Sequence, residues 1–242
     1  MHPSPLLRRA FAEFLGTGLL VAIVVGSGIM ATRLSEDVGI QLLANSIATA
    51  LGLAVLILML GPVSGAHFNP AVSLVDWLLG RRRRVGLSSP SLGIYAVAQI
   101  AGAIGGAVLA NLMFDVPTSL STTDRATPAT LLAEVVATFG LILLIVALAR
   151  TGRGAAAAPA VGAYIGAAYW FTSSTSFANP AVTIGRLFSD TFAGIGASSV
   201  LPFIGAQLVG AAIAVLAAML LFPHVTDAAE EIVIPQLDAE HG

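Results

Sequence analysis

The sequence predicts an all-α membrane protein with six transmembrane helices and two re-entrant half-helices, arranged as an inverted repeat. Three observations predict this fold. Hydrophobic residues make up 57% of the 242 residues and charged residues only 10%, well below the share usual in soluble domains. Apolar stretches of about 20 residues recur, long enough to cross a lipid bilayer. The sequence Asn-Pro-Ala-Val occurs twice, at 69–72 and at 179–182.

Composition also excludes several classes of function. The chain has no cysteine, so it can form neither a disulfide nor a thiolate metal site. Its net charge of −2 argues against the broad basic surface of a nucleic-acid binder. No nucleophile–base pair or metal-ligand cluster stands out in the sequence. We therefore expect no catalytic residue, no metal and no cofactor, and we predict that the protein is not an enzyme.

Apolar runs place the six crossings at about 11–31, 41–60, 92–114, 129–149, 159–171 and 200–222. Two further segments, one after 61–62 and one at 172–187, are too short to cross. We expect residues 1–242 to form a single membrane domain. Its two repeats cover about 7–114 and 129–222, the polar stretch 115–128 links them, and an acidic tail occupies 223–242.

Arginines predict the orientation of this integral membrane protein. All eleven basic residues are arginine. With the N-terminus inside, eight of them face the cytoplasm (8, 9, 81–84, 150 and 153) and three face outward (33, 125 and 186). This bias predicts that both termini are cytoplasmic. The run 81–84 could instead bind lipid headgroups or nucleic acid, but an anchor of topology is the simpler interpretation.

The surroundings of Asn-Pro-Ala repeat as well. Ala-Glu-x-x-x-Thr begins at 12 and again at 133, and Ala-Gln-x-x-Gly begins at 98 and again at 206. Each half contains three crossings, and an odd number inverts the second half relative to the first. Inverted halves commonly build a pathway around a site near the membrane midplane. Glycines in the third and sixth crossings predict close helix packing: Gly102, Gly105, Gly106, Gly205 and Gly210.

Each Asn-Pro-Ala reads as the start of a short helix, because asparagine caps helices well and proline suits the first turn. The two motifs are Asn69-Pro70-Ala71 and Asn179-Pro180-Ala181. In inverted halves the two helices would meet near the midplane with their positive ends towards one point. Two amide donors there would favour neutral solutes over cations and protons. The alternative is that Asn-Pro merely caps two ordinary helices.

These motifs resemble the aquaporin and glycerol-facilitator superfamily, the major intrinsic proteins. The resemblance covers about 7–222 and rests on Ala-Glu-Phe-Leu-Gly-Thr at 12–17, on Ser-Gly-Ala-His-Phe-Asn-Pro-Ala-Val at 64–72, and on the second Asn-Pro-Ala at 179–181. It implies six spans with two half-helices, one pore in each subunit and a homotetramer.

Three polar residues inside the predicted bundle have two interpretations each. Glu13 and Glu134 are ionisable groups within spans, which suggests function by default and would suit a proton-coupled carrier. Alternatively, each carboxylate accepts hydrogen bonds from its re-entrant segment, and the resemblance favours that interpretation. His67 could be a ligand or a proton relay, but a lone histidine is better explained as a hydrogen-bonding group of the pore wall.

The sequence departs from its family at the outer constriction. Most members have an arginine directly after the second Asn-Pro-Ala, where this chain has Val182. Counting without gaps puts the other selectivity-filter positions at Thr49, Ala167 and Ser176, although a two-residue slip would give Tyr169 in place of Ala167. Arg186 lies one helical turn beyond Val182. Glycerol-type members usually have aspartate where this chain has Thr183.

Small or uncharged filter residues predict a wider and less cationic mouth than a strict water channel has. We expect a passive channel for small uncharged solutes: water together with small polyols or metalloid hydroxides such as arsenous acid. The alternatives are a mainly water-selective pore, narrowed by Tyr169 or Arg186, and an ion-coupled secondary transporter. A resemblance to aquaporin-like proteins associated with bacterial arsenic resistance also implies a bacterial inner (plasma) membrane.

Overall fold

The computed structural model describes residues 5–80 and 86–222. All regular secondary structure in these residues is helical. Four helices make up the first half: α1 (Leu6–Leu34), α2 (Val38–Ser64), the short α3 (Pro70–Gly80) and α4 (Ser89–Met113). The second half contains α5 (Pro128–Arg150), the 3-10 turn η1 (Gly154–Ala156), α6 (Ala157–Phe171), the short α7 (Pro180–Arg186) and α8 (Ala197–Leu221). The predicted arginine anchor at 81–84 and the acidic tail lie outside the described residues.

Six helices make the crossings, and α3 and α7 are the two half-helices. Among the described residues, five helices are long and apolar enough to cross a membrane by length and composition: α1, α2, α4, α5 and α8. The fifth crossing in chain order is α6, which has only 15 residues and so rises about 22 Å. The turn η1 precedes it directly. The predicted order of crossings and short helices is therefore confirmed.

Local chemistry explains where several helices begin. Oδ1 of Asp37 accepts hydrogen bonds from the backbone nitrogens of Gly39 and Ile40, at 2.7 and 3.1 Å, and so caps α2. Thr127 and Thr130 form a reciprocal capping box at the start of α5. Such caps satisfy backbone donors that have no partner within the helix.

The two halves pack in the same way. α1 lies along α4, α5 lies along α8, and α2 packs against α6 to join the halves. A Cβ on Gly106 would collide with the carbonyl oxygen of Gly18, and one on Gly210 would collide with that of Val135. Gly102 is equally close to α1, whereas Gly105 and Gly205 face open space. Close packing was thus predicted wrongly for those two glycines, because the sequence does not show which face of an apolar helix is buried.

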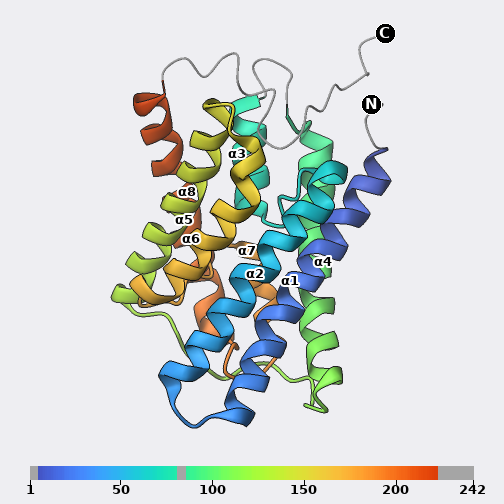
Figure 1. Ribbon diagram of the computed structural model, residues 1–242, viewed down its shortest axis with the longest axis vertical. Coiled ribbons are helices and arrows are strands. Elements are labelled where there is room, and N and C mark those ends of the chain that lie inside the picture. Colours follow the sequence, from blue (N-terminus) through green and yellow to red (C-terminus); the bar gives the residue numbers. More distant parts are fainter. Residues whose placement is uncertain (1–4, 81–85, 223–242) are drawn as a thin grey trace.

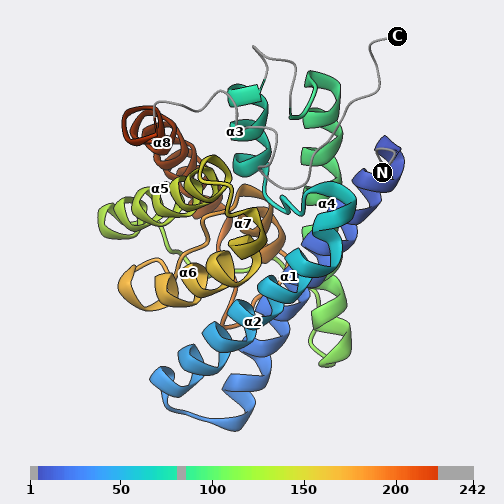
Figure 2. The same cartoon turned by 45° about the horizontal axis from the view of Figure 1, so that its top comes forward.

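Polarity is distributed as in a membrane protein. Large apolar side chains such as Leu51, Val97 and Leu201 are exposed on the outside of the bundle. Buried positions instead include the side chains of Glu13, Gln99, Glu134 and Gln207. In a bilayer, polar groups are tolerated where other protein groups can bind them. The half-helices α3 and α7 lie inside this bundle (Figures 1 and 2).

Segments far apart in sequence meet at each end of the bundle. α1 begins and α8 ends at the same end, at the top of Figure 1, while the turn between α1 and α2 lies at the opposite end. At this opposite end the linker between the halves binds the loop after α7. The backbone nitrogen of Ser121 donates to Leu187 at 2.8 Å, and Arg125 donates to the carbonyl oxygens of Gly194 and Phe192 at 2.6 and 2.9 Å.

Candidate pore

The two segments before α3 and α7 have the same unusual backbone. Ala66 and Phe68 have φ values of 49° and 48°, and Ser176 and Ala178 have values of 53° and 47°. Residues other than glycine rarely adopt this left-handed backbone conformation, because their Cβ atom crowds the backbone. Such a conformation persists only where surrounding contacts hold it.

Glu13 supplies those contacts in the first half. One carboxylate oxygen accepts hydrogen bonds from Ser64 Oγ at 2.6 Å and from the backbone nitrogen of His67 at 3.0 Å. The other accepts from the backbone nitrogen of Phe68 and from Gln99 Nε2, both at 2.7 Å. A single carboxylate on α1 thereby binds the backbone nitrogens of a re-entrant segment that has no helical partners of its own.

Glu134 occupies the matching position in the second half. It accepts hydrogen bonds from Ser174 Oγ at 2.6 Å and from the backbone nitrogens of Phe177 and Ala178 at 2.8 and 2.9 Å. Gln207 Nε2 donates to it at 2.7 Å. Both glutamates have 0% exposure. These contacts favour the supporting role over a titrating one.

Asn69 and Asn179 each make one contact within their own segment and one across the centre. Their Oδ1 atoms accept from the backbone nitrogens of Ala71 and Ala181, both at 2.9 Å, which caps the short helices. Their Nδ2 atoms donate to the opposite half: Asn69 to the carbonyl oxygen of Ala178 and Asn179 to that of Phe68, both at 2.8 Å. An amide nitrogen has two hydrogens, so each asparagine keeps a second donor.

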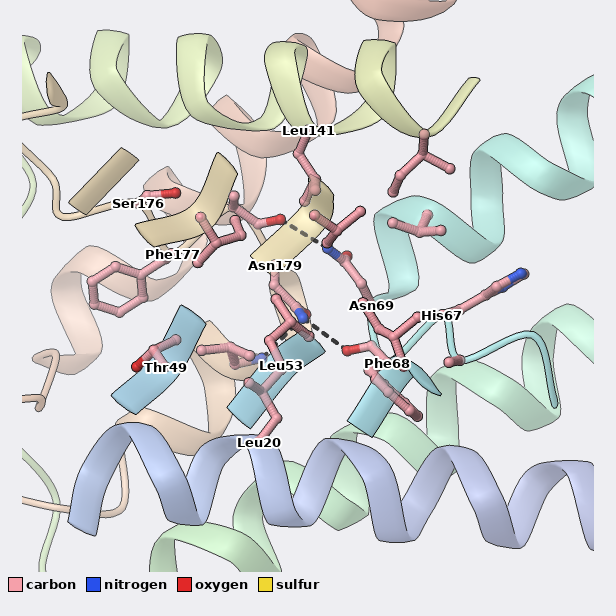
Figure 3. A pocket seen from close by; sticks show the side chains of 18 of the residues that line it. Leu20, Thr49, Leu53, His67, Phe68, Asn69, Leu141, Ser176, Phe177 and Asn179 are labelled. Carbon is pink, nitrogen blue, oxygen red and sulfur yellow. Dashed lines mark hydrogen bonds between the residues drawn. The ribbon is translucent and has the colours of Figure 1, made fainter. Parts of the chain in front are cut away.

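A cavity of about 80 Å³ runs past these asparagines. In Figure 3, Asn69 and Asn179 lie in its middle, His67 towards one end, and Thr49, Ser176 and Phe177 towards the other. The space is several times that of a single water molecule. Its wall is mainly aliphatic, a feature that the sequence did not reveal, and includes Leu20, Val24, Leu53, Leu141, Val161 and Ile165.

His67 lines the cavity towards the end of the bundle where α1 begins and α8 ends. Its Nδ1 lies 3.0 Å from Ser73 Oγ, and its ring packs edge-on against Tyr95 with 5.6 Å between the ring centres. These contacts fix the ring. They agree with the interpretation of His67 as a hydrogen-bonding group of the wall.

Towards the opposite end the cavity is lined by Thr49, Ser176 and Val182, as the count from the asparagines predicts. Ala167 does not line it but is exposed on the outer face of α6. Tyr169 takes that place, and its hydroxyl lies 3.2 Å from Oγ1 of Thr49. The ungapped count is therefore wrong in placing Ala167 at the cavity, and the residue given by the two-residue slip, Tyr169, lines it.

Arg186 also lines this part of the cavity, although it stands one turn beyond Val182 on α7. Its guanidinium carbon lies 3.5 Å from the centre of the Phe177 ring, and its Nε donates to the carbonyl oxygen of Ala193. Only 3% of the residue is exposed. The long side chain reaches back to the cavity, which sequence position alone could not show.

Comparison with known proteins decides the family. The family model described as "Major intrinsic protein" matches residues 1–178. The chain is 53% identical over 212 residues to the aquaglyceroporin AqpS of Rhizobium meliloti (strain 1021), covering 87% of this chain and 88% of that protein. This chain belongs to the major intrinsic protein family. Members of this family are membrane channels, not enzymes.

Two more distant comparisons agree with a major intrinsic protein. The glycerol uptake facilitator protein of Pseudomonas aeruginosa is 37% identical over 113 residues, which cover 46% of this chain and 38% of that protein. The X-ray structure of the aquaglyceroporin from Plasmodium falciparum superposes with a TM-score of 0.69 at 21% identity, covering 91% of this chain and 99% of the other. The latter likeness establishes the fold.

Proposed function

We propose that this protein is a passive channel that conducts water together with small polyols or metalloid hydroxides such as arsenous acid. The reciprocal bonding of Asn69 and Asn179 carries the proposal, because it fixes both short helices with their first turns at one point in the cavity. The N-terminus of a helix behaves as about half a positive charge. Two such ends repel a cation or a proton, while the remaining amide hydrogens donate to the oxygen of a neutral solute.

The filter residues support solutes larger than water. Valine at position 182 adds neither charge nor hydrogen-bond donors, and Thr49 and Ser176 are small and hydroxylic. Two relatives are named as an aquaglyceroporin and a glycerol uptake facilitator, which agrees with passage of polyols. Aliphatic side chains along the cavity offer contact to the carbon side of such solutes.

A mainly water-selective pore is the second candidate, because Tyr169 and Arg186 both line the cavity near Val182. Light scattering of proteoliposomes separates the two candidates. Vesicles containing the channel should shrink in hyperosmotic glycerol, urea or arsenous acid and then re-swell faster than empty vesicles. If only the initial water efflux is accelerated, the water-selective candidate is correct.

An ion-coupled transporter would need a titrating group that gains access to each side in turn. Glu13 and Glu134 are the membrane-embedded carboxylates available for this role, and each is engaged by four hydrogen bonds. The channel proposal therefore requires that an imposed pH gradient never drives solute uphill. Accumulation of labelled glycerol against its gradient would refute it.

For the assembly, we propose a homotetramer in a bacterial inner membrane with both termini in the cytoplasm. The exposed apolar side chains on the outside of the bundle suit either lipid or a neighbouring subunit. Mass measurement in detergent should give four copies. Cysteines introduced at Ser35 and Ser88, in a chain that has none of its own, should react with an impermeant reagent from outside and inside respectively.

A further inference from the structure

The guanidinium of Arg186 is buried and carries hydrogens that the protein does not use. Its Nε donates to Ala193, but within residues 5–80 and 86–222 no acceptor takes a hydrogen of Nη1 or Nη2. The face of the group lies on the Phe177 ring. Since the residue lines the cavity, the unused edge of the guanidinium is available to a molecule inside it.

A second polar group in the same part of the cavity is also unused. Ser176 is 4% exposed, and its Oγ has no hydrogen-bond partner among the described residues. Buried polar atoms are nearly always bonded, so this hydroxyl has capacity for one more partner. In the observed rotamer the oxygen is covered by protein, and binding a molecule in the cavity requires the side chain to rotate. Ser176 directly precedes Phe177, the ring on which Arg186 lies.

No carboxylate of the described residues is hydrogen-bonded to this guanidinium. Glu134 is the buried carboxylate of this half, and its oxygens are taken by Ser174, Gln207 and the backbone. Arg125 adds a second guanidinium 5.5 Å from the same Phe177 ring. Glu134 acts on Arg186 only through space, and burying a cation without a directly bound counter-charge is costly, so this end of the cavity should attract an anion.

Two acidic groups near Arg186, one in the linker and one in the loop after α7, are occupied elsewhere. Asp124 accepts hydrogen bonds from Ser199 and from the backbone nitrogen of Ala126, and Asp190 accepts from the backbone nitrogen of Thr122. These bonds, led by the one from Ser199 at Asp124 and the one from Thr122 at Asp190, lower the pKa of each carboxyl. Both side chains lie on the exterior, whereas Arg186 points into the cavity.

We propose that Arg186 and Ser176 form a binding site for a small oxyanion or carboxylate at the end of the cavity away from the start of α1 and the end of α8. The flat fork of a guanidinium matches two oxygens of one anion, and the serine hydroxyl donates to the same anion. Because the cavity is the proposed solute pathway, a bound anion obstructs it. The site thus makes the conductance for neutral solutes depend on the anions in the surrounding medium.

Binding is tested first, on full-length protein in detergent, so that the result does not depend on the proposed function. Thermal unfolding is followed in sodium formate, sodium phosphate and sodium chloride at equal ionic strength. We expect the wild type to unfold at a higher temperature in formate or phosphate than in chloride. The formate and phosphate arms distinguish a carboxylate from an inorganic oxyanion as the preferred ligand.

Matched variants locate the site. Arg186→Gln should lose the stabilisation by anions, and Arg186→Lys should keep only part of it, because lysine retains the charge without the fork. Arg33→Gln is the control: it removes the same charge from another guanidinium that lies over an aromatic ring, 5.3 Å from the centre of Phe114, outside the cavity. If Arg186→Gln does not fold, Ser176→Ala must weaken binding while the guanidinium remains.

Glycerol flux is then measured in phosphatidylcholine vesicles with the same anion concentration on both sides, to test whether the bound anion obstructs the cavity. At an anion concentration ten times the measured Kd, only about one channel in eleven is free, so glycerol flux should fall about tenfold. Equal stabilisation in chloride, or in Arg186→Gln, overturns the proposed site. Unchanged glycerol flux at saturating anion overturns the obstruction. Anion binding without any glycerol flux refutes the polyol channel and leaves the binding site standing.

Discussion

The hydroxyl of Tyr169 on α6 lies 3.2 Å from Oγ1 of Thr49 on α2, and both residues line the cavity. This pair joins the two halves of the chain beside Val182. Of the two residues that the sequence left open for this place, Ala167 and Tyr169, the aromatic one lines the cavity. The proposed filter thus contains an aromatic ring as well as a valine at position 182.

Replacing Tyr169 with alanine should widen the constriction. The change removes the ring and its contact with Thr49, so glycerol and urea permeability should rise relative to water permeability, by several fold in stopped-flow light scattering. Ala167→Leu is the matched control, since position 167 is exposed on the outside of the same helix. An unchanged ratio of solute to water flux in Tyr169→Ala would exclude the ring from the constriction.

Introducing Val182→Arg, alone and with Thr49→Phe, should narrow the same place. Arginine adds bulk, a fixed charge and several donors, so solute flux should fall more than water flux, and most strongly in the double variant. The same vesicle assay measures both fluxes. If wild type excludes every solute larger than water, or if neither variant changes solute flux, the wide filter is wrong.

Replacing Asn69 or Asn179 with aspartate should abolish selective conduction. A carboxylate cancels the positive field of the two helix ends and cannot donate to Ala178 or Phe68, which the asparagines do at 2.8 Å. Folding must be checked by gel filtration, because a buried carboxylate is costly. A folded variant that still conducts solutes and excludes protons would falsify the paired-asparagine mechanism.

Glu13→Gln and Glu134→Gln should destabilise the fold to a similar extent. Each replaces an acceptor of four hydrogen bonds, from groups including Ser64 and Ser174, with an amide that cannot accept them all. Hydrogen bonds to charged groups contribute about 1.5–3 kcal/mol each, so a large drop in Tm is expected. Glu36→Gln, at an exposed position, serves as the control. Full stability of both buried variants would contradict the supporting role.

Adjacent glycines on α4 should respond very differently to enlargement. Gly106→Val places a side chain against the backbone of Gly18, whereas Gly105→Val points into open space. The first should separate α1 from α4 and lower the yield of folded protein, and the second should leave it unchanged. Thermal unfolding in detergent measures both. Comparable Tm values for the two variants would show that α1 and α4 tolerate a larger spacing.

Short local motifs made much of the fold predictable. Ala-Glu and Asn-Pro-Ala recur because each half must fix its own re-entrant backbone, and a glutamate at one position with an asparagine at another suffices for that. The prediction that Ala167 lines the cavity was wrong because the count from Asn179 crossed the loop between α6 and α7, and the length of a loop does not fix which face of the preceding helix a residue occupies. The sequence could not decide whether Arg186 reaches the filter, because a side chain of its length can extend a helical turn away from its own backbone.

Other features are hidden by the composition itself. Helices that are apolar all round have no face that the sequence can distinguish, so the aliphatic wall formed by Leu53 and Leu141, and the exposed positions of Gly105 and Gly205, emerge only when the helices are packed. The left-handed backbone at Phe68 and Ala178 is equally unexpected from residue type. Tertiary contacts, rather than local preference, impose that backbone.

The exchange of hydrogen bonds between Asn69 and Ala178, and between Asn179 and Phe68, also orders events during synthesis. The first half-helix needs partners that leave the ribosome more than 100 residues later. Until then the carbonyl oxygen of Phe68 lacks its donor and the amide of Asn69 lacks its acceptor, and irregular backbone is not tolerated against lipid. We expect chains truncated before residue 178 to leave this segment at the membrane surface. A half-made protein would then contain no open pathway through the membrane, because the pathway forms only when the two Asn-Pro-Ala segments meet.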